Sequence, residues 1–154
     1  MLKYVDTKVT FAEVPNEISL CINITGCKIG CKNCHSSYLA EDIGEELNSL
    51  SLKELISNNK GITCISFMGG DSNPSKIDAL AQWVKINYPI KTAWYSGRQE
   101  LSKEINLDNF NFIKLGPYIE DLGPLNSKTT NQRFYKIEEG KLVDITNLFW
   151  RDCD

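Results

Sequence analysis

Short strand-like runs that alternate with helix-like segments restrict the fold of this chain more than any other feature. The runs are rich in β-branched and aromatic residues, as strands usually are. They are Ile18 to Thr25, Ile62 to Met68, Lys91 to Tyr95 and Phe110 to Leu115. Helix-like segments separate the first three runs, and this order favours right-handed crossovers and a mostly parallel sheet. We therefore expect an α/β fold.

Local signals indicate where the helices begin. The spacing of Ser51 and Glu54 is that of a capping box at the start of a helix from Ser51 to Asn58. Asn73 followed by Pro74 is a favourable start for a second helix, which reaches Asn87. Its apolar residues recur with helical spacing and predict one buried face: Ile77, Leu80, Ala81 and Val84.

The two ends of the chain predict additions to this sheet. The segment from Phe134 to Ile145, with Glu139 and Gly140 at its turn, predicts a hairpin, and the residues up to Glu13 predict an edge ribbon. A chain of 154 residues has the size of one domain and is too short for an eightfold barrel. We expect a single domain over residues 1–154, built as a partial, open β/α barrel with a C-terminal hairpin.

Composition and charge exclude several classes of function. The net charge of −3, without a basic stripe, argues against a nucleic-acid partner. No apolar segment is long enough to span a bilayer, and Met1 to Thr10 lacks the apolar centre of a signal peptide. We expect a cytoplasmic protein that does not bind membranes. The sequence has a single histidine and no obvious acid–base pair, which argues against a hydrolytic enzyme.

Unusual motifs directly follow the four predicted strands. They are Cys27 to Cys34, Gly69-Gly70-Asp71, Ser96-Gly97 and Gly116-Pro117. In open α/β sheets, ligands bind beyond the carboxyl ends of the strands. The four motifs are therefore expected to meet at one edge of the sheet.

The first of these motifs has the chemistry of a metal site. Cys27, Cys31 and Cys34 form C-x-x-x-C-x-x-C, and the interleaved Gly26 and Gly30 let the backbone curl without Cβ clashes. Three thiolates are one ligand short of a closed zinc site or a four-cysteine cluster. A four-iron cluster held here would keep one iron free to bind another ligand.

Two other kinds of metal site compete with this interpretation. A zinc-binding protein would need a fourth ligand from His35, Cys21, Cys64 or Cys153. An electron carrier could use the C-x-x-C-H signature of c-type haem that ends at His35. Cys21 and Cys64 alternate with apolar residues inside predicted strands, which predicts buried small side chains, whereas Cys153 is expected to be a mobile thiol.

The cysteine spacing resembles that of the radical S-adenosylmethionine superfamily, in which the open iron binds the methionine end of the cofactor. The resemblance implies a [4Fe-4S] cluster and S-adenosyl-L-methionine as cofactors. Gly69-Gly70-Asp71 resembles the superfamily's Gly-Gly-Glu segment, which contacts the methionine amino group, although Asp is one methylene shorter than Glu. The resemblance also implies cofactor contacts for Ser96, and for the backbones of Asn33 and His35 on either side of Cys34.

Within that superfamily, the chain resembles the activating proteins of anaerobic, class III ribonucleoside-triphosphate reductase. Leu115 to Leu122 and Thr130-Asn131-Gln132-Arg133 carry this likeness, which runs over essentially the whole chain. It implies reductive cleavage of S-adenosylmethionine to a 5′-deoxyadenosyl radical, which takes hydrogen from a glycine of the reductase. The implied partners are that reductase and a low-potential electron donor such as flavodoxin. The segments 116–122 and 131–133 are candidates for docking the reductase or for supporting the site.

Two alternatives remain within the superfamily. A radical S-adenosylmethionine enzyme could act on a different glycyl-radical enzyme or on a small molecule. Neither alternative would require this reductase as the substrate.

Overall fold

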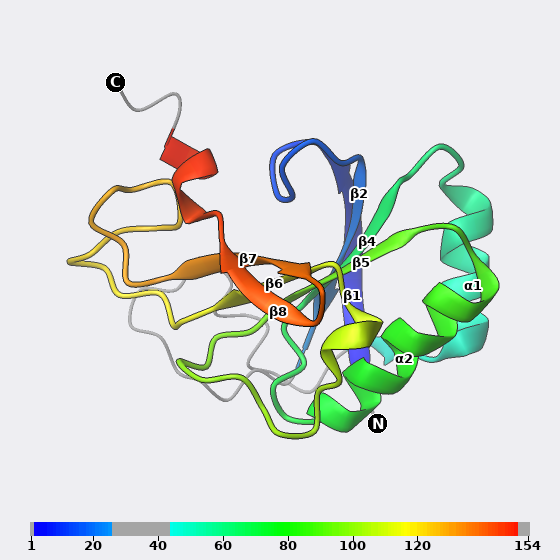
Figure 1. Cartoon of the computed structure of the whole chain (residues 1–154). Helices are drawn as coiled ribbons and strands as arrows, with labels where there is room; N and C mark the ends of the chain where they lie inside the picture. The colour runs from blue at the N-terminus through cyan, green and yellow to red at the C-terminus, as the bar shows by residue number, and fades with distance from the viewer. Residues whose placement is uncertain (1, 26–43, 151–154) are drawn as a thin grey trace.

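The computed structural model describes residues 2–25 and 44–150, which form one mixed sheet with two helices packed on it (Figure 1). In the described residues the strand order is β3-β1-β2-β4-β5-β6-β7-β8. The strands are β1 Lys3–Thr10, β2 Ser19–Ile24, β3 Glu45–Glu46, β4 Cys64–Met68, β5 Lys91–Tyr95, β6 Phe112–Leu115, β7 Arg133–Glu138 and β8 Lys141–Asp144. The helices are α1 Ser49–Asn58 and α2 Pro74–Asn87, with short 3₁₀ helices η2 Leu107–Asn109 and η3 Thr146–Trp150.

The centre of the sheet is parallel and both flanks are antiparallel. Strands β2, β4, β5 and β6 run in the same direction, whereas β1 and β3 on one side and β7 and β8 on the other reverse it. The sheet is therefore mixed where the sequence predicts a mostly parallel one, because hairpin connections extend it at both ends. β3 and β8 form its two edges, and a partial barrel stays a prediction.

The predicted strands are present, and two of them begin two residues later than predicted. The strand expected from Ile62 begins at Cys64, and the one expected from Phe110 begins at Phe112. Phe110 ends the 3₁₀ helix η2, where its N–H donates to Leu107 O. The predicted C-terminal hairpin is confirmed, and its two turn residues both have positive φ, as such tight turns require.

The start of α1 differs from the prediction. Asn48 is the N-cap, and its side chain accepts a hydrogen bond from the Ser51 N–H at 3.0 Å. The Ser51 hydroxyl accepts in return from the Asn48 N–H at 2.8 Å. The capping box is therefore Asn48 with Ser51, and the predicted pair of Ser51 with Glu54 is wrong, because the chain is already helical from Ser49.

The start of α2 matches the prediction. The Asn73 side chain accepts from the Lys76 N–H at 3.3 Å, and Pro74 occupies the first turn. The predicted apolar face is also confirmed, and its residues all pack into the core: Ile77, Leu80, Ala81 and Val84.

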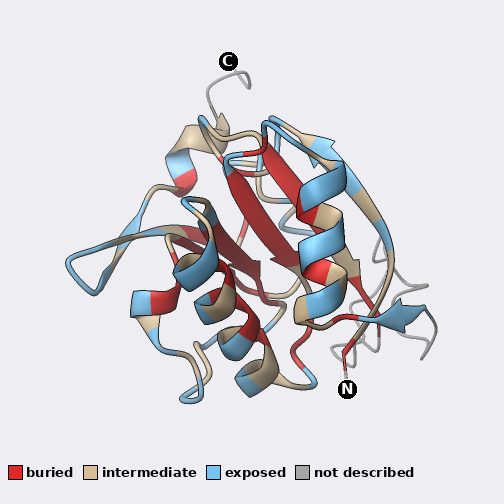
Figure 2. Ribbon diagram, turned by 90° about the vertical axis from the view of Figure 1, so that its right-hand side faces the viewer, coloured by how far each residue is buried: buried red, intermediate tan, exposed pale blue. Residues whose placement is uncertain are grey.

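The two faces of the sheet are covered in different ways. Both α1 and α2 lie on one face, where their buried sides meet the strands (Figures 1 and 2). A smaller cluster covers the opposite face and contains no residue of α1 or α2: Val14, Cys64, Ala93, Tyr95, Phe112 and Phe134. The ring of Phe134 packs edge-on against that of Phe149 in η3, with centroids 5.0 Å apart. Most of the buried apolar side chains therefore lie on the face with the two helices, and short segments such as η3 cover the opposite face.

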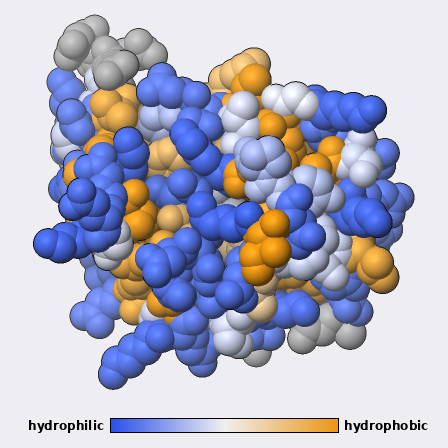
Figure 3. Space-filling view, turned by 45° about the vertical axis from the view of Figure 1, so that its right-hand side comes forward, coloured by the Kyte–Doolittle hydropathy of each residue, from blue (hydrophilic) through white to orange (hydrophobic). Residues whose placement is uncertain are grey.

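No helix among residues 2–25 and 44–150 is long and apolar enough to cross a membrane. On the side drawn in Figure 3, hydrophobic side chains form separate groups among hydrophilic ones. Leu50 and Ile86 are the most exposed aliphatic side chains described.

The turn from β4 into α2 depends on two glycines with positive φ. Gly69 and Gly70 have φ of 105° and 90°, conformations that residues with a Cβ adopt at a cost. A Cβ added at Gly70 would lie 2.6 Å from Cδ1 of Ile77, which is fully buried in α2. Gly70 therefore lets the helix pack closely against the end of β4.

Gly70→Ala should lower the free energy of unfolding by about 2–4 kcal/mol, since it adds a clash with Ile77 to the strain of positive φ. Gly61→Ala is the matched control, because Gly61 has φ of 94° but nothing within 4 Å of the added Cβ. The control should lose only about 1 kcal/mol. Urea denaturation of both variants measures the difference, and equal losses would contradict the packing argument.

Candidate functional site

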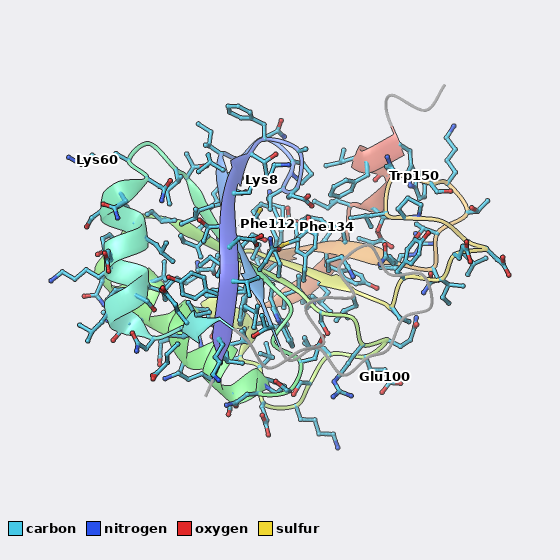
Figure 4. All side chains as sticks on the ribbon, turned by 180° about the vertical axis from the view of Figure 1, so that it is seen from behind. Lys8, Lys60, Glu100, Phe112, Phe134 and Trp150 are labelled. Atoms are coloured by element: carbon cyan, nitrogen blue, oxygen red, sulfur yellow. The ribbon has the colours of Figure 1, made fainter. Side chains whose placement is uncertain are left out.

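The parallel centre of the sheet brings three of the predicted motifs to one edge. Gly69, Ser96 and Gly116 follow β4, β5 and β6 directly. Backbone hydrogen bonds hold these ends together, from Gly69 N to Tyr95 O at 3.0 Å and from Ser96 N to Lys114 O at 2.9 Å. In Figure 4, Glu100 in the loop after β5 lies far from Lys60, which precedes β4 at the other edge.

We call this edge the rim and define it as residues 69–71, 96–98, 116–117 and 131–132. The last pair belongs to it because β7 runs antiparallel to β6, so that the start of β7 lies beside the end of β6. Leu115 pairs with Arg133 in that ladder.

Asp71 joins the loops that follow β4 and β5. Its side chain is 5% exposed, and Oδ1 accepts from the Ser96 hydroxyl at 2.5 Å. Oδ2 accepts from the Gly97 N–H at 2.9 Å. The Ser96 hydroxyl oxygen also accepts from the Arg98 N–H at 3.1 Å. Both carboxylate oxygens of Asp71 are thus used within the rim, where the side chain fixes the relative position of two loops.

The Gly69-Gly70 turn is held from both neighbouring elements. The indole N–H of Trp94 donates to Gly69 O at 2.7 Å, and the Asn73 N–H donates to Gly70 O at 3.0 Å. Trp94 is itself fully buried on the helical face of β5. The turn therefore has a fixed backbone and no side chains of its own, which suits close approach by a ligand.

Lys114 is a buried cation that sequence reasoning missed. It lies in β6, is 8% exposed, and its ammonium donates to Ser96 O at 3.1 Å and to Gly116 O at 2.9 Å. The ammonium also lies 6.0 Å from the centroid of the Tyr95 ring. A lysine within an otherwise apolar strand, Phe112–Leu115, is the signal that would have found it. The charge is stabilised by carbonyl oxygens at the ends of two strands.

Gly116 packs against the residues that precede β7. Its φ is 108°, and a Cβ added there would lie 3.1 Å from the Cα of Gln132. The Gln132 side-chain amide donates to Gly116 O at 3.4 Å, and that of Asn131 donates to Pro117 O at 3.1 Å. The segments 116–117 and 131–132 therefore support each other. Arg133 points elsewhere and forms an exposed ion pair of 3.6 Å with Asp144 of the hairpin.

Two of the cysteines are buried inside the sheet, as predicted. Cys21 and Cys64 are 4% and 0% exposed, on the adjacent strands β2 and β4. Burial raises the pKa of each thiol from its ordinary 9.0 to about 12. Both thiols stay protonated at neutral pH, which makes them poor metal ligands. Over the described ranges, no group of three His, Cys, Asp or Glu side chains could hold a metal ion.

The predicted cluster ligands Cys27, Cys31 and Cys34 lie outside the described residues, as do Asn33, His35 and Cys153. The chain enters the segment 26–43 at the rim, since β2 ends at Ile24 beside the end of β4. A Cβ added at Gly69 would lie 3.3 Å from Ile24 O. The three cysteines therefore follow, along the chain, a strand end that contacts the Gly69-Gly70 turn.

One comparison with known proteins gave a match. A family model described as a 4Fe-4S single cluster domain matches residues 18–135, which is more than half of the chain. This span includes the three cysteines of the C-x-x-x-C-x-x-C motif and the whole rim. No curated protein and no solved structure matches the chain.

Asp71→Ala should destabilise the protein by about 2–4 kcal/mol, because it leaves the buried Ser96 hydroxyl and the Gly97 N–H without their acceptor. Asp121→Ala is a control with the same change of charge at an exposed position, and it should change stability by less than about 0.5 kcal/mol. Chemical denaturation of both variants tests this. An Asp71→Ala variant as stable as wild type would show that the carboxylate does not join the two loops.

Iodoacetamide at pH 8 should leave Cys21 and Cys64 unmodified in the native protein and alkylate both in urea, because only unfolding lowers their pKa toward 9.0. Between pH 9 and about pH 12, these two thiols keep their protons in the native protein but release them in the unfolded chain. Their contribution to stability is therefore complete below pH 9 and is lost as the pH rises toward 12. Mass spectrometry of the peptides measures the labelling, and rapid labelling of native Cys64 would refute its burial.

Proposed function

The chain belongs to the family of 4Fe-4S single cluster domains, and from that premise we propose that it is a radical S-adenosylmethionine enzyme. Its proposed reaction is the activation of an anaerobic, class III ribonucleoside-triphosphate reductase, in which it generates a glycyl radical on the reductase. The observation that carries the proposal is the three-cysteine motif, which lies within the matched span and directly follows the strand end beside the rim.

The available thiols fit a four-iron cluster with one open iron. Cys27, Cys31 and Cys34 would be its ligands, and the two buried thiols of the sheet are poor candidates for a fourth. Cys21 and Cys64 are held in strands with a pKa of about 12. A cluster with three protein ligands keeps a coordination position for the amino and carboxylate groups of S-adenosylmethionine.

The backbone of the rim is suited to contact bound S-adenosylmethionine. We assign the Gly69-Gly70 turn to the methionine end, because neither residue has a side chain that would keep a ligand away from the backbone. Asp71 and Ser96 would shape this turn, since each already bonds the other. The backbones of Asn33 and His35 would complete the site on the other side of Cys34.

When bound, a reduced cluster would supply the one electron needed for reductive cleavage of S-adenosylmethionine, and so the radical chemistry that removes a hydrogen atom from the substrate. The chain's own residues then have three tasks. The rim orients the cofactor, the buried core beneath it excludes water, and the open edge admits a glycine-containing loop of the reductase. The electron would come from a low-potential donor such as flavodoxin.

The other candidate functions differ in what they would bind and cleave. The family match supports iron–sulfur binding over a zinc site or a haem site. An electron carrier would hold a cluster without cleaving S-adenosylmethionine. A radical enzyme that acts on a small molecule, or on another glycyl-radical enzyme, would cleave the cofactor without needing this reductase.

The anaerobically reconstituted and reduced protein should give a [4Fe-4S] electron paramagnetic resonance signal that shifts when S-adenosylmethionine is added. Cys27→Ala, Cys31→Ala and Cys34→Ala should each lose the signal, because a cluster with two thiolates is not retained. Cys64→Ala should keep it and serves as the matched control, since that thiol is buried in β4. A cluster whose spectrum ignores the cofactor would refute the radical mechanism and leave electron transfer.

The same preparation identifies the substrate. Mixed with the reductase and S-adenosylmethionine, it should produce a glycyl radical doublet on the reductase. A reductase in which the radical-bearing glycine is replaced by alanine should give none. Cofactor cleavage without a doublet would instead support a different glycyl-radical enzyme or a small-molecule substrate.

A further inference from the structure

The side-chain carbonyl of Asn131 is buried at the rim and has no hydrogen-bond partner among the described residues. The orientation of this amide is determined, because its nitrogen donates to Pro117 O at 3.1 Å. The unpaired atom is therefore the acceptor, Oδ1. Buried polar atoms without a partner are rare in proteins, and each calls for a physical explanation.

The groups around Asn131 have other partners. Gly116 O accepts from the Lys114 ammonium and the Gln132 amide, at 2.9 and 3.4 Å. The Gln132 N–H donates to the Thr130 hydroxyl at 3.0 Å. The Lys114 ammonium and the Gln132 amide are thus directed at another oxygen, and Oδ1 of Asn131 is suited to a donor that comes from a ligand.

The position of Asn131 determines which part of a ligand it faces. It precedes β7, whereas the Gly69-Gly70 turn follows β4, and these strands are separated by β5 and β6. Three strand spacings correspond to about 14 Å. A single chemical group cannot contact both places, but an elongated ligand can place one end at each.

We propose that Oδ1 of Asn131 accepts a hydrogen bond from the adenosine half of S-adenosylmethionine, from either the adenine amine or a ribose hydroxyl. This inference rests on the proposed function and adds a residue that determines specificity. The methionine end is already assigned to the open iron and the Gly69-Gly70 turn. The adenosine half carries the N–H and O–H donors that an unpaired acceptor needs.

Titration calorimetry without oxygen tests the contact with S-adenosylhomocysteine, which binds but is not cleaved. The cluster-loaded Asn131→Leu variant should bind it about tenfold more weakly than wild type, because the ligand donor loses its acceptor on binding. Ser19→Ala is the matched control, since Ser19 Oγ is also buried but lies at the opposite end of β2, away from the rim. The control should bind like wild type.

Analogues of the ligand identify the donor and guard against a folding defect. S-inosylhomocysteine lacks the adenine amine, and the 2′-deoxy and 3′-deoxy analogues each lack one ribose hydroxyl. One of the three should bind wild type about tenfold more weakly than S-adenosylhomocysteine does, yet bind Asn131→Leu no more weakly than the parent ligand. If Asn131→Leu does not melt cooperatively, Asn131→Asp replaces it, retains an acceptor oxygen, and should keep the wild-type preference among the analogues.

Two results would overturn the contact. Equal affinity of folded Asn131→Leu and wild type would do so, as would analogue losses that are the same in both proteins. In both cases wild type still binds S-adenosylhomocysteine, so the proposed function stands. Failure of cluster-loaded wild type to bind it at all would instead refute the proposed function and this inference together.

Discussion

The ends of the parallel strands impose the constraint on which the rim depends. Where parallel strands stop, their last carbonyl groups leave the hydrogen-bond ladder and need other donors if they are buried. Here the donors are buried side chains, namely the Lys114 ammonium for Ser96 O and Gly116 O, and the Trp94 indole for Gly69 O. Because neighbouring strands end at nearly the same level, one long side chain can reach two of these carbonyls.

This arrangement places two opposite charges in one hydrogen-bonded network. Asp71 and Lys114 are each less than a tenth exposed, and an isolated charge at that depth would be costly. Ser96 links them, since its hydroxyl donates to Asp71 and its carbonyl accepts from Lys114. Removing either charge leaves the other with fewer compensating groups. The network therefore keeps the rim rigid before any ligand binds, which lowers the ordering cost of binding.

The sequence predicts the scaffold better than the rim because the two depend on contacts of different range. Strand composition and the spacing of Ile77, Leu80 and Val84 are local patterns, and they located β5 and the buried face of α2. The predicted N-cap of α1 was wrong by three residues, Ser51 instead of Asn48. Asn48 and Glu54 both have the right spacing from Ser51 to form a capping box, and only the position where the helix starts decides between them. The bond between Ser96 and Asp71 spans 25 residues. No local pattern contains it, and the same holds for the bonds from Lys114 to Ser96 O and from Asn131 to Pro117 O.

Burial also separates the cysteines by their chemistry. A thiol must lose its proton to bind iron, and desolvation in β2 and β4 raises the pKa of Cys21 and Cys64 far above neutral pH. Burial in the sheet therefore makes Cys21 and Cys64 poor ligands for the cluster that we propose on the C-x-x-x-C-x-x-C motif. The same core that withdraws these two side chains also fixes the strand ends at the rim. Hydrophobic burial thus acts twice, since it makes these two thiols poor iron ligands and holds the strand ends beside which the proposed cluster motif begins.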